Sequence, residues 1–132
     1  MTREEIISFV RANYGDDAPL LLGIIQTESS FRADAFLNDR NGGSYGLMQL
    51  DVPTARDRGY IGEGVGLFDS EKNITVGAAQ VAWIRDFLAG HNIFDLESVI
   101  AAYNEGVGNV LKGRADPGYV NRVLTAMKEF TT

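Results

Sequence analysis

The chain has 132 residues and no cysteine, with 45% hydrophobic residues, 23% charged residues and a formal net charge of -6. The length suits one domain with a hydrophobic core, and the composition is that of a soluble globular protein. Without cysteine there are no disulfides and no thiolate metal sites, and the acidic charge argues against broad electrostatic capture of nucleic acid or of an anionic membrane. An anionic polymer would have to be bound through local contacts.

No segment has the pattern of a targeting or membrane-spanning sequence. Residues 1–5 lack the basic-then-apolar order of a signal peptide, and the longest apolar run, residues 19–25, is too short to cross a bilayer. We therefore expect no membrane insertion, and the sequence leaves open whether a leader was removed. No repeat or linker divides the chain, so residues 1–132 are predicted to form a single domain.

Helical patterns dominate the chain. A capping box over residues 2–5 predicts a helix to about Ala12, and a second helix is predicted from Ala18 or Pro19 to Ser29. Residues 38–46 are rich in turn-forming residues and predict a small β-ribbon. Further helical segments are predicted at Pro53–Arg58, Ser70–Ala89, Leu96–Asn104, a short turn to Leu111, and Pro117–Phe130. This pattern predicts a mainly α fold with a loop-rich cleft side, in which Trp83 is expected in the core and His91 at the surface.

One carboxylate lies on the apolar face of a predicted helix. Leu21, Ile24 and Ile25 precede Glu28 by seven, four and three positions, so they share its face. A carboxyl group held against apolar side chains resists ionisation and can donate a proton near neutral pH, which is what cleavage of a glycosidic bond requires. The pattern alone is equally compatible with a structural glutamate that caps a neighbouring element or pairs with Arg32.

A glycine-containing segment, residues 42–49, follows this helix. Glycine allows the backbone to approach a ligand closely, while Ser44 and Gln49 offer hydrogen bonds suited to sugar hydroxyl and acetamido groups. Met48 offers a soft apolar contact. An ordinary hairpin with core residues would have the same pattern.

Five other residues are candidates for the same site. Tyr103 and Asn104 end a predicted helix, and Tyr119 follows the start of another, where a tyrosine can stack on a sugar or hydrogen-bond an acid. Asp39 and Asp51 flank the hairpin and are the carboxylates nearest Glu28 in sequence that could act as a second catalytic group. Solvated or capping roles are the alternative for both aspartates. No cofactor, metal or nucleotide is indicated.

Several short motifs occur in one order over roughly residues 20–125. In chain order they are Glu28-Ser29-Ser30-Phe31, Gly46-Leu47-Met48-Gln49, Thr54-Ala55-Arg56, Leu67-Phe68-Asp69, Asn73-Ile74 with Gly77, Ala102-Tyr103-Asn104-Glu105-Gly106, and Tyr119-Val120 with Val123. Each motif is weak alone, but the ordered set resembles the soluble lytic transglycosylases of bacterial cell walls, relatives of goose-type lysozyme.

The resemblance implies a lysozyme-like domain with a small β-ribbon beside the cleft, acting on peptidoglycan glycan strands at the bacterial cell wall. The sequence does not reveal the oligomeric state, and we expect a monomer. It implies that Glu28 protonates the leaving oxygen of the β-1,4 bond between N-acetylmuramic acid and N-acetylglucosamine. Glu28 would then deprotonate the 6-hydroxyl, which closes a 1,6-anhydro ring. The substrate-binding positions implied by the resemblance are Ser44, Tyr45, Met48, Gln49, Tyr103, Asn104 and Tyr119.

The sequence departs from the family pattern in two places. Gln80 stands where many relatives have an aromatic residue. Asp39 and Asp51 fall near aspartates of goose-type lysozyme that are implicated in holding the attacking water, with a spacing that differs by one residue. Hydrolysis by a muramidase-type site therefore stays open beside anhydro formation. A non-catalytic peptidoglycan-binding module is a third hypothesis.

Overall fold

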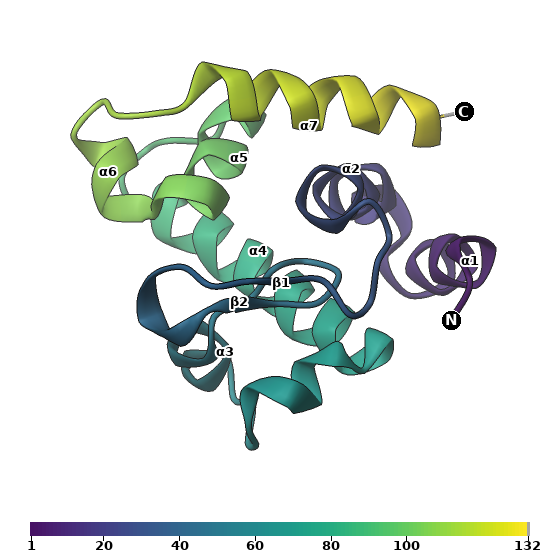
Figure 1. Ribbon diagram of the computed structural model, residues 1–132. Helices are drawn as coiled ribbons and strands as arrows, with labels where there is room; N and C mark the ends of the chain where they lie inside the picture. Colours follow the sequence, from purple (N-terminus) through teal and green to yellow (C-terminus); the bar gives the residue numbers. More distant parts are fainter. Residues whose placement is uncertain (132) are drawn as a thin grey trace.

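The computed structural model describes residues 1–131, and for Arg40 the backbone only. In Figure 1, α2 lies between α7 and α1, and a short hairpin passes in front of α4 in this view. The α-helices are α1 (Arg3–Tyr14), α2 (Ala18–Ser29), α3 (Val52–Asp57), α4 (Ser70–Ala89), α5 (Leu96–Glu105), α6 (Val107–Leu111) and α7 (Pro117–Phe130). The strands are β1 (Phe36–Leu37) and β2 (Ser44–Tyr45), and the 3-10 helices are η1 (Gly15–Asp17), η2 (Arg40–Gly42) and η3 (Gly64–Phe68). The mainly α fold with a small β-ribbon is confirmed.

Side-chain caps set where most helices begin. The Thr2 hydroxyl accepts from the backbone N–H of Glu5, and the Glu5 carboxylate accepts in return from the N–H of Thr2, which completes the predicted capping box. Aspartates cap four later helices in the same way, each accepting from the N–H three residues on: Asp51, Asp69, Asp95 and Asp116. These caps explain why the sequence predicts the starts of α4, α5 and α7 so closely.

The core is built around α2. Leu22, Ile24 and Ile25 are fully buried, and the helix packs chiefly against α7, which lies across it in Figure 1. Helix α4 contributes the buried Ile74 and Ile84 to the core. Helix α1, directly before α2 in the chain, also packs against it, so the helix that carries Glu28 contacts segments from both ends of the described chain.

The hairpin is attached to α4 by one buried amide. Strands β1 and β2 are antiparallel, with Phe36 opposite Tyr45. Asn73 of α4, fully buried, donates from Nδ2 to the carbonyl oxygens of Tyr45 and Leu67 at 2.8 Å each. Its Oδ1 accepts from the N–H of Met48, also at 2.8 Å. One side chain thus fixes the hairpin, the segment before α4 and the loop that follows β2.

The turn after β2 requires a glycine. Gly46 has φ +77°, and its N–H donates to the carbonyl of Ala35 at 2.8 Å. A Cβ at this position would overlap with the Asn73 amide and the Leu67 carbonyl oxygen, so both the conformation and the space exclude other residues. The Gly-Leu-Met-Gln motif therefore begins with a residue that its fold demands.

The expected burial of Trp83 is wrong. Its side chain is 37% exposed on α4, and the Arg58 guanidinium lies 4.6 Å from its ring centre. The buried stripe of α4 faces the other way, and the cation covers part of the ring that the core does not. His91 is exposed, as predicted. In the described part of the chain, no helix combines the length and apolar character needed to cross a membrane.

Candidate active site

The side chain of Glu28 lines a polar cavity near the end of α2. It is the second-last residue of the helix and is half-buried. The cavity has a volume of about 200 Å³, and its lining residues are Glu28, Leu37, Asp39, Ser44, Gln49, Asp51, Tyr103 and Asn104. The structure therefore brings together six of the candidates that the sequence singled out around Glu28.

The environment of Glu28 favours its protonated form. Burial raises the pKa of the Glu28 carboxyl, and the negative charge of Asp39 adds to the rise. A hydrogen bond from the Tyr119 hydroxyl to Oε2, 2.7 Å long, and the positive charge of Arg122 act in the opposite direction. The carboxyl group can therefore hold a proton at a higher pH than an exposed glutamate. Its anion, once formed, is stabilised by the hydrogen bond from Tyr119. Both properties suit a group that gives a proton and later takes one back.

Two tyrosines support the site from the protein side. Burial and the nearby Glu28 carboxylate raise the pKa of both Tyr103 and Tyr119, so both phenols stay protonated donors. Tyr119 donates to Glu28, and Tyr103 donates to the carbonyl oxygen of Met48 at 2.7 Å. Tyr119 does not line the cavity; it reaches the acid from α7 and holds its orientation.

The two aspartates face the same cavity but have different local partners. Asp39 accepts hydrogen bonds from the Ser44 hydroxyl at 2.8 and 3.1 Å across the hairpin. Asp51 is the N-cap of α3 and accepts from the N–H of Thr54 at 2.7 Å. The capping role predicted for Asp51 is confirmed, and it leaves the carboxylate facing the cavity as well.

Gln49 is fixed in place by the loop that carries it. Its Nε2 donates to the carbonyl oxygens of Ala35 and Gly46, each at 3.1 Å, and its backbone φ is +50°. A non-glycine residue in this conformation is uncommon and marks a position that the surrounding structure over-determines. The amide thus lines the cavity in a single orientation.

Two of the expected binding residues do not line the Glu28 cavity. Met48 is fully buried, and its thioether packs where a Cβ of Gly77 would be, so the expected sugar contact of its side chain is wrong. The ring of Tyr45 packs between Phe36 and Phe68, with ring centres 5.0 and 5.5 Å apart, and does not line the Glu28 cavity. Both residues shape the loop instead, Met48 through its carbonyl and Tyr45 through its ring.

The sequence reasoning missed two residues near Glu28. Leu37 lines the cavity although it is 58% exposed, and a two-residue strand is too short for an alternating pattern to reveal its direction. Arg122 lies one helical turn after Tyr119 with its guanidinium 6.0 Å from that ring centre. The spacing of three residues on α7 is the signal that could have linked it to the site.

The cavity continues into a neighbouring hollow of about 280 Å³. The two share Gln49, Asp51, Tyr103 and Asn104. Gln80, where the sequence departs from the family pattern, lines this second part together with Thr54 and Glu105. Together the two hollows form a groove with polar lining residues. Residues 1–131 contain no group of three or more His, Cys, Asp or Glu side chains placed to hold a metal ion.

Comparison with known proteins shows the family to which the chain belongs. Residues 5–121 match the family model described as the transglycosylase SLT domain. The chain belongs to this family. Glu28 and the residues that line the groove lie within the matched residues of this SLT domain. The first two residues of α1 and the part of α7 after residue 121 lie outside them.

Several curated proteins are similar to this SLT domain. Membrane-bound lytic murein transglycosylase C of Edwardsiella ictaluri is 35% identical over 125 residues, covering 86% of this chain and 34% of that protein. The protein of the same name from Histophilus somni is 35% identical over 147 residues, covering 92% of this chain and 39% of that protein. The chain therefore spans between a third and two fifths of the length of these relatives.

Two solved structures share the fold. An inactive mutant of lytic transglycosylase Slt from Pseudomonas aeruginosa superposes with a TM-score of 0.76 and 23% identity, covering 98% of this chain and 24% of that one. The 70 kDa soluble lytic transglycosylase of Escherichia coli gives a TM-score of 0.75 and 20% identity, with the same coverages. The expected lysozyme-like architecture of this family is confirmed.

Proposed function

We propose that this SLT domain is a peptidoglycan lytic transglycosylase with Glu28 as its catalytic acid and base. The observation that carries the proposal is the half-buried Glu28 carboxyl, whose pKa is raised by burial, at the wall of a polar groove and hydrogen-bonded by Tyr119. The names of the curated relatives, which are lytic murein transglycosylases, support it. The bond cleaved is the β-1,4 bond between N-acetylmuramic acid and N-acetylglucosamine.

In the first step Glu28 gives its proton to the glycosidic oxygen as the bond to C1 breaks. The acetamido oxygen of the muramic acid residue attacks C1 and carries the positive charge. The Glu28 carboxylate, stabilised by the Tyr119 hydroxyl, then accepts the proton of the 6-hydroxyl, and O6 displaces the acetamido oxygen to close the 1,6-anhydro ring. No water is consumed, and Glu28 ends protonated as it began.

The remaining polar groups of the cavity would bind the sugar. Gln49 has its Nε2 fixed by two carbonyl oxygens, so we assign its Oε1 to a hydroxyl or acetamido N–H of the substrate. Ser44 and Asn104 line the same wall, and the Tyr103 ring forms part of its surface. We propose that the domain acts as a monomer at the bacterial cell wall, in the periplasm or outside the cell, including delivery by a phage.

Hydrolysis is the second candidate, because Asp39 and Asp51 face the cavity that contains Glu28. In that reaction one aspartate would hold a water molecule, and the water would attack C1 from the side opposite the leaving group. The product would then carry a free reducing end. The same acid serves both reactions, so the fate of C1 depends on whether water or O6 reaches it first.

The deciding experiment uses purified peptidoglycan and mass spectrometry of the released muropeptides. Glu28→Gln keeps the size of the side chain and removes the proton, so we expect cleavage to fall by at least about a hundredfold. Glu71→Gln, on the exposed first turn of α4, is the matched control and should cleave normally. An anhydro product is one water lighter than a hydrolytic one. Near-native cleavage by Glu28→Gln would overturn the proposal, and sugar binding without any product would favour a non-catalytic module.

A further inference from the structure

The backbone directly after α2, the helix that carries Glu28, is strained. Helix α2 ends at Ser29, and the next two residues both adopt the left-handed conformation, Ser30 with φ 52° and Phe31 with φ 63°. For a bulky residue such as Phe31 a positive φ is a genuine outlier, and such conformations persist only where the surroundings hold them. The strain lies two and three residues from the proposed catalytic acid, so whatever holds Phe31 also holds the last turn of α2.

The side chain of Phe31 is held by the two ends of the described chain. Its ring centre lies 5.9 Å from that of Phe130, a buried residue at the end of α7. The guanidinium of Arg3, in the first turn of α1, covers both rings, 4.8 Å from the centre of Phe31 and 5.6 Å from that of Phe130. Cation–π contacts of this kind are attractive and directional.

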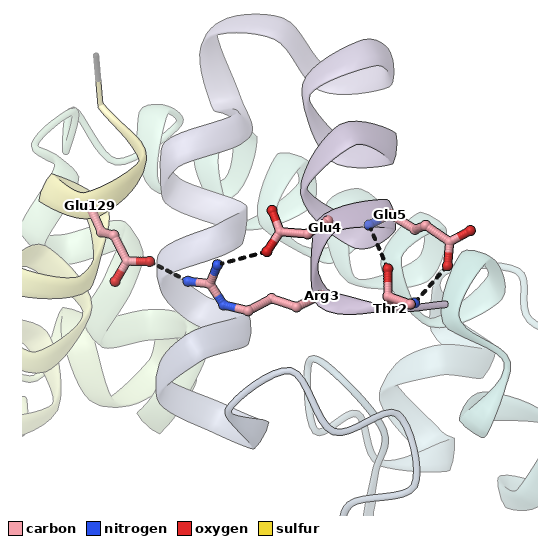
Figure 2. A network of polar contacts seen from close by, with 5 residues as sticks. All are labelled: Thr2, Arg3, Glu4, Glu5 and Glu129. Carbon is pink, nitrogen blue, oxygen red and sulfur yellow. Dashed lines mark hydrogen bonds and ion pairs between the residues drawn. The ribbon is translucent and has the colours of Figure 1, made fainter.

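Arg3 is in turn fixed by carboxylates. Figure 2 shows its guanidinium extending from α1 toward Glu129 of α7, with which it forms an ion pair, while a second nitrogen lies 3.6 Å from Glu4. Exposed ion pairs add little stability by themselves. Here they set the position of a cation that lies 4.8 and 5.6 Å from the centres of two aromatic rings. We call the group Arg3, Phe31, Glu129 and Phe130 the terminal clasp.

Most of the terminal clasp lies outside the part of the chain that the family model matches. Arg3 precedes residues 5–121, and Glu129 and Phe130 follow them, whereas Phe31 lies within them. The strained turn is thus inside the matched region, and the residues that hold it come from the flanking segments of this chain.

We propose that Arg3 is a positioning residue for Glu28, acting through the terminal clasp. It holds Phe31 in its left-handed conformation and so keeps the last turn of α2, with Glu28, directed into the groove. The proposal rests on the proposed function. Without the cation, Ser30 and Phe31 can relax to negative φ, and the carboxyl group moves relative to the glycosidic oxygen. Small displacements of a catalytic group are costly for the chemical step and much less so for binding.

The test compares Arg3→Ala with a control variant, Arg85→Ala. Arg3 acts near the end of α2, and Arg85 acts near its start. Arg85 of α4 forms an ion pair of similar exposure with Asp17, directly before α2. We expect Arg3→Ala to lower kcat about tenfold with KM within about twofold of wild type, and Arg85→Ala to leave both unchanged. Equal kcat values for Arg3→Ala and wild type would overturn the proposal, whatever happens to thermal stability.

A rescue separates positioning from a general loss of stability. Ser30 is exposed, and glycine adopts its left-handed conformation without penalty. We therefore expect Ser30→Gly to restore most of the lost kcat in the Arg3→Ala protein and to change wild type little. Arg3→Lys, which keeps the charge, should recover part of it. Failure of Ser30→Gly to raise kcat would contradict the role of the strained turn.

A measurement that does not depend on catalysis distinguishes failure of the proposed function from failure of the positioning role of Arg3. Native-state hydrogen exchange at residues 26–31 should rise about fivefold or more in Arg3→Ala and stay unchanged in Arg85→Ala. If wild type cleaves no glycan, the proposed function fails and the exchange result alone decides the clasp. Unchanged exchange at these residues would overturn the proposal.

Discussion

The hydroxyl of Tyr119 donates a 2.7 Å hydrogen bond to Oε2 of Glu28, which joins α7 to the end of α2 across 91 positions of the chain. Burial favours the neutral carboxyl group, and this hydrogen bond favours the anion. The pair thus moderates a pKa that burial alone would raise further, and it fixes the direction of the carboxyl oxygen atoms.

Tyr119→Phe removes only the donor, so the pKa of Glu28 should rise further. Because the proposed reaction needs Glu28 protonated at the start, the alkaline limb of kcat/KM against pH should move to higher pH. We expect kcat at the optimum to fall about tenfold, since a hydrogen bond to a charged group contributes about 1.5 kcal/mol. The pH profile of cleavage measures both effects. A limb that stays in place would show that the hydrogen bond does not act on the ionisation of Glu28.

Asp39→Asn should shift the same limb in the opposite direction. The negative charge of Asp39 raises the pKa of Glu28, so its neutral replacement lowers it and the alkaline limb moves to lower pH. Asparagine still accepts from the Ser44 hydroxyl, so the hairpin contact is kept. If Asp39 also holds a water molecule, the anhydro fraction of the product rises in the variant. A shift in the same direction as that of Tyr119→Phe would contradict the electrostatic assignment.

The sequence predicts those features of the fold that depend only on residues close together in the chain. The bounds of α2, α4 and α7 follow from apolar periodicity and from first-turn prolines or aspartate caps, and the shared face of Glu28 and Ile24 follows from helical spacing. The expected sugar contact of the Met48 side chain is wrong because its burial depends on Gly77, which is 29 positions away on α4. The Tyr119–Glu28 hydrogen bond likewise depends on how α2 and α7 pack, which no local pattern contains.

Asn73 should be one of the most sensitive positions for stability. Asn73→Ala leaves the carbonyl oxygens of Tyr45 and Leu67 and the N–H of Met48 without their partner in a buried place. We expect the free energy of unfolding to fall by about 3 kcal/mol, measured by urea denaturation. Asn73→Asp keeps the acceptor for Met48 and loses both donors, so it should also destabilise. A loss below about 1 kcal/mol in both variants would show that water replaces the amide.

The raised pKa of Glu28 also predicts how stability depends on pH. The folded protein holds the proton of Glu28 above the pH at which the unfolded chain releases it. This contribution to stability is fully present below the ordinary glutamate pKa of 4.5 and is lost as the pH rises through the folded pKa. Gln is neutral throughout, so Glu28→Gln should raise Tm by about 3 °C at pH 7.5 and change it little at pH 4.

Glu5 provides the control of opposite sign for that experiment. Hydrogen bonds from the backbone N–H and the hydroxyl of Thr2 lower the pKa of Glu5, so its contribution is present at neutral pH and is lost as the pH falls through its folded pKa. Glu5→Gln should therefore lower Tm at pH 7.5 more than at acidic pH, whereas Glu28→Gln raises it. Thermal denaturation of the three proteins at both pH values measures this. If Glu28→Gln instead destabilised the fold at pH 7.5, the carboxylate would be better satisfied than its burial indicates, and its assignment as a proton donor near neutral pH would fail.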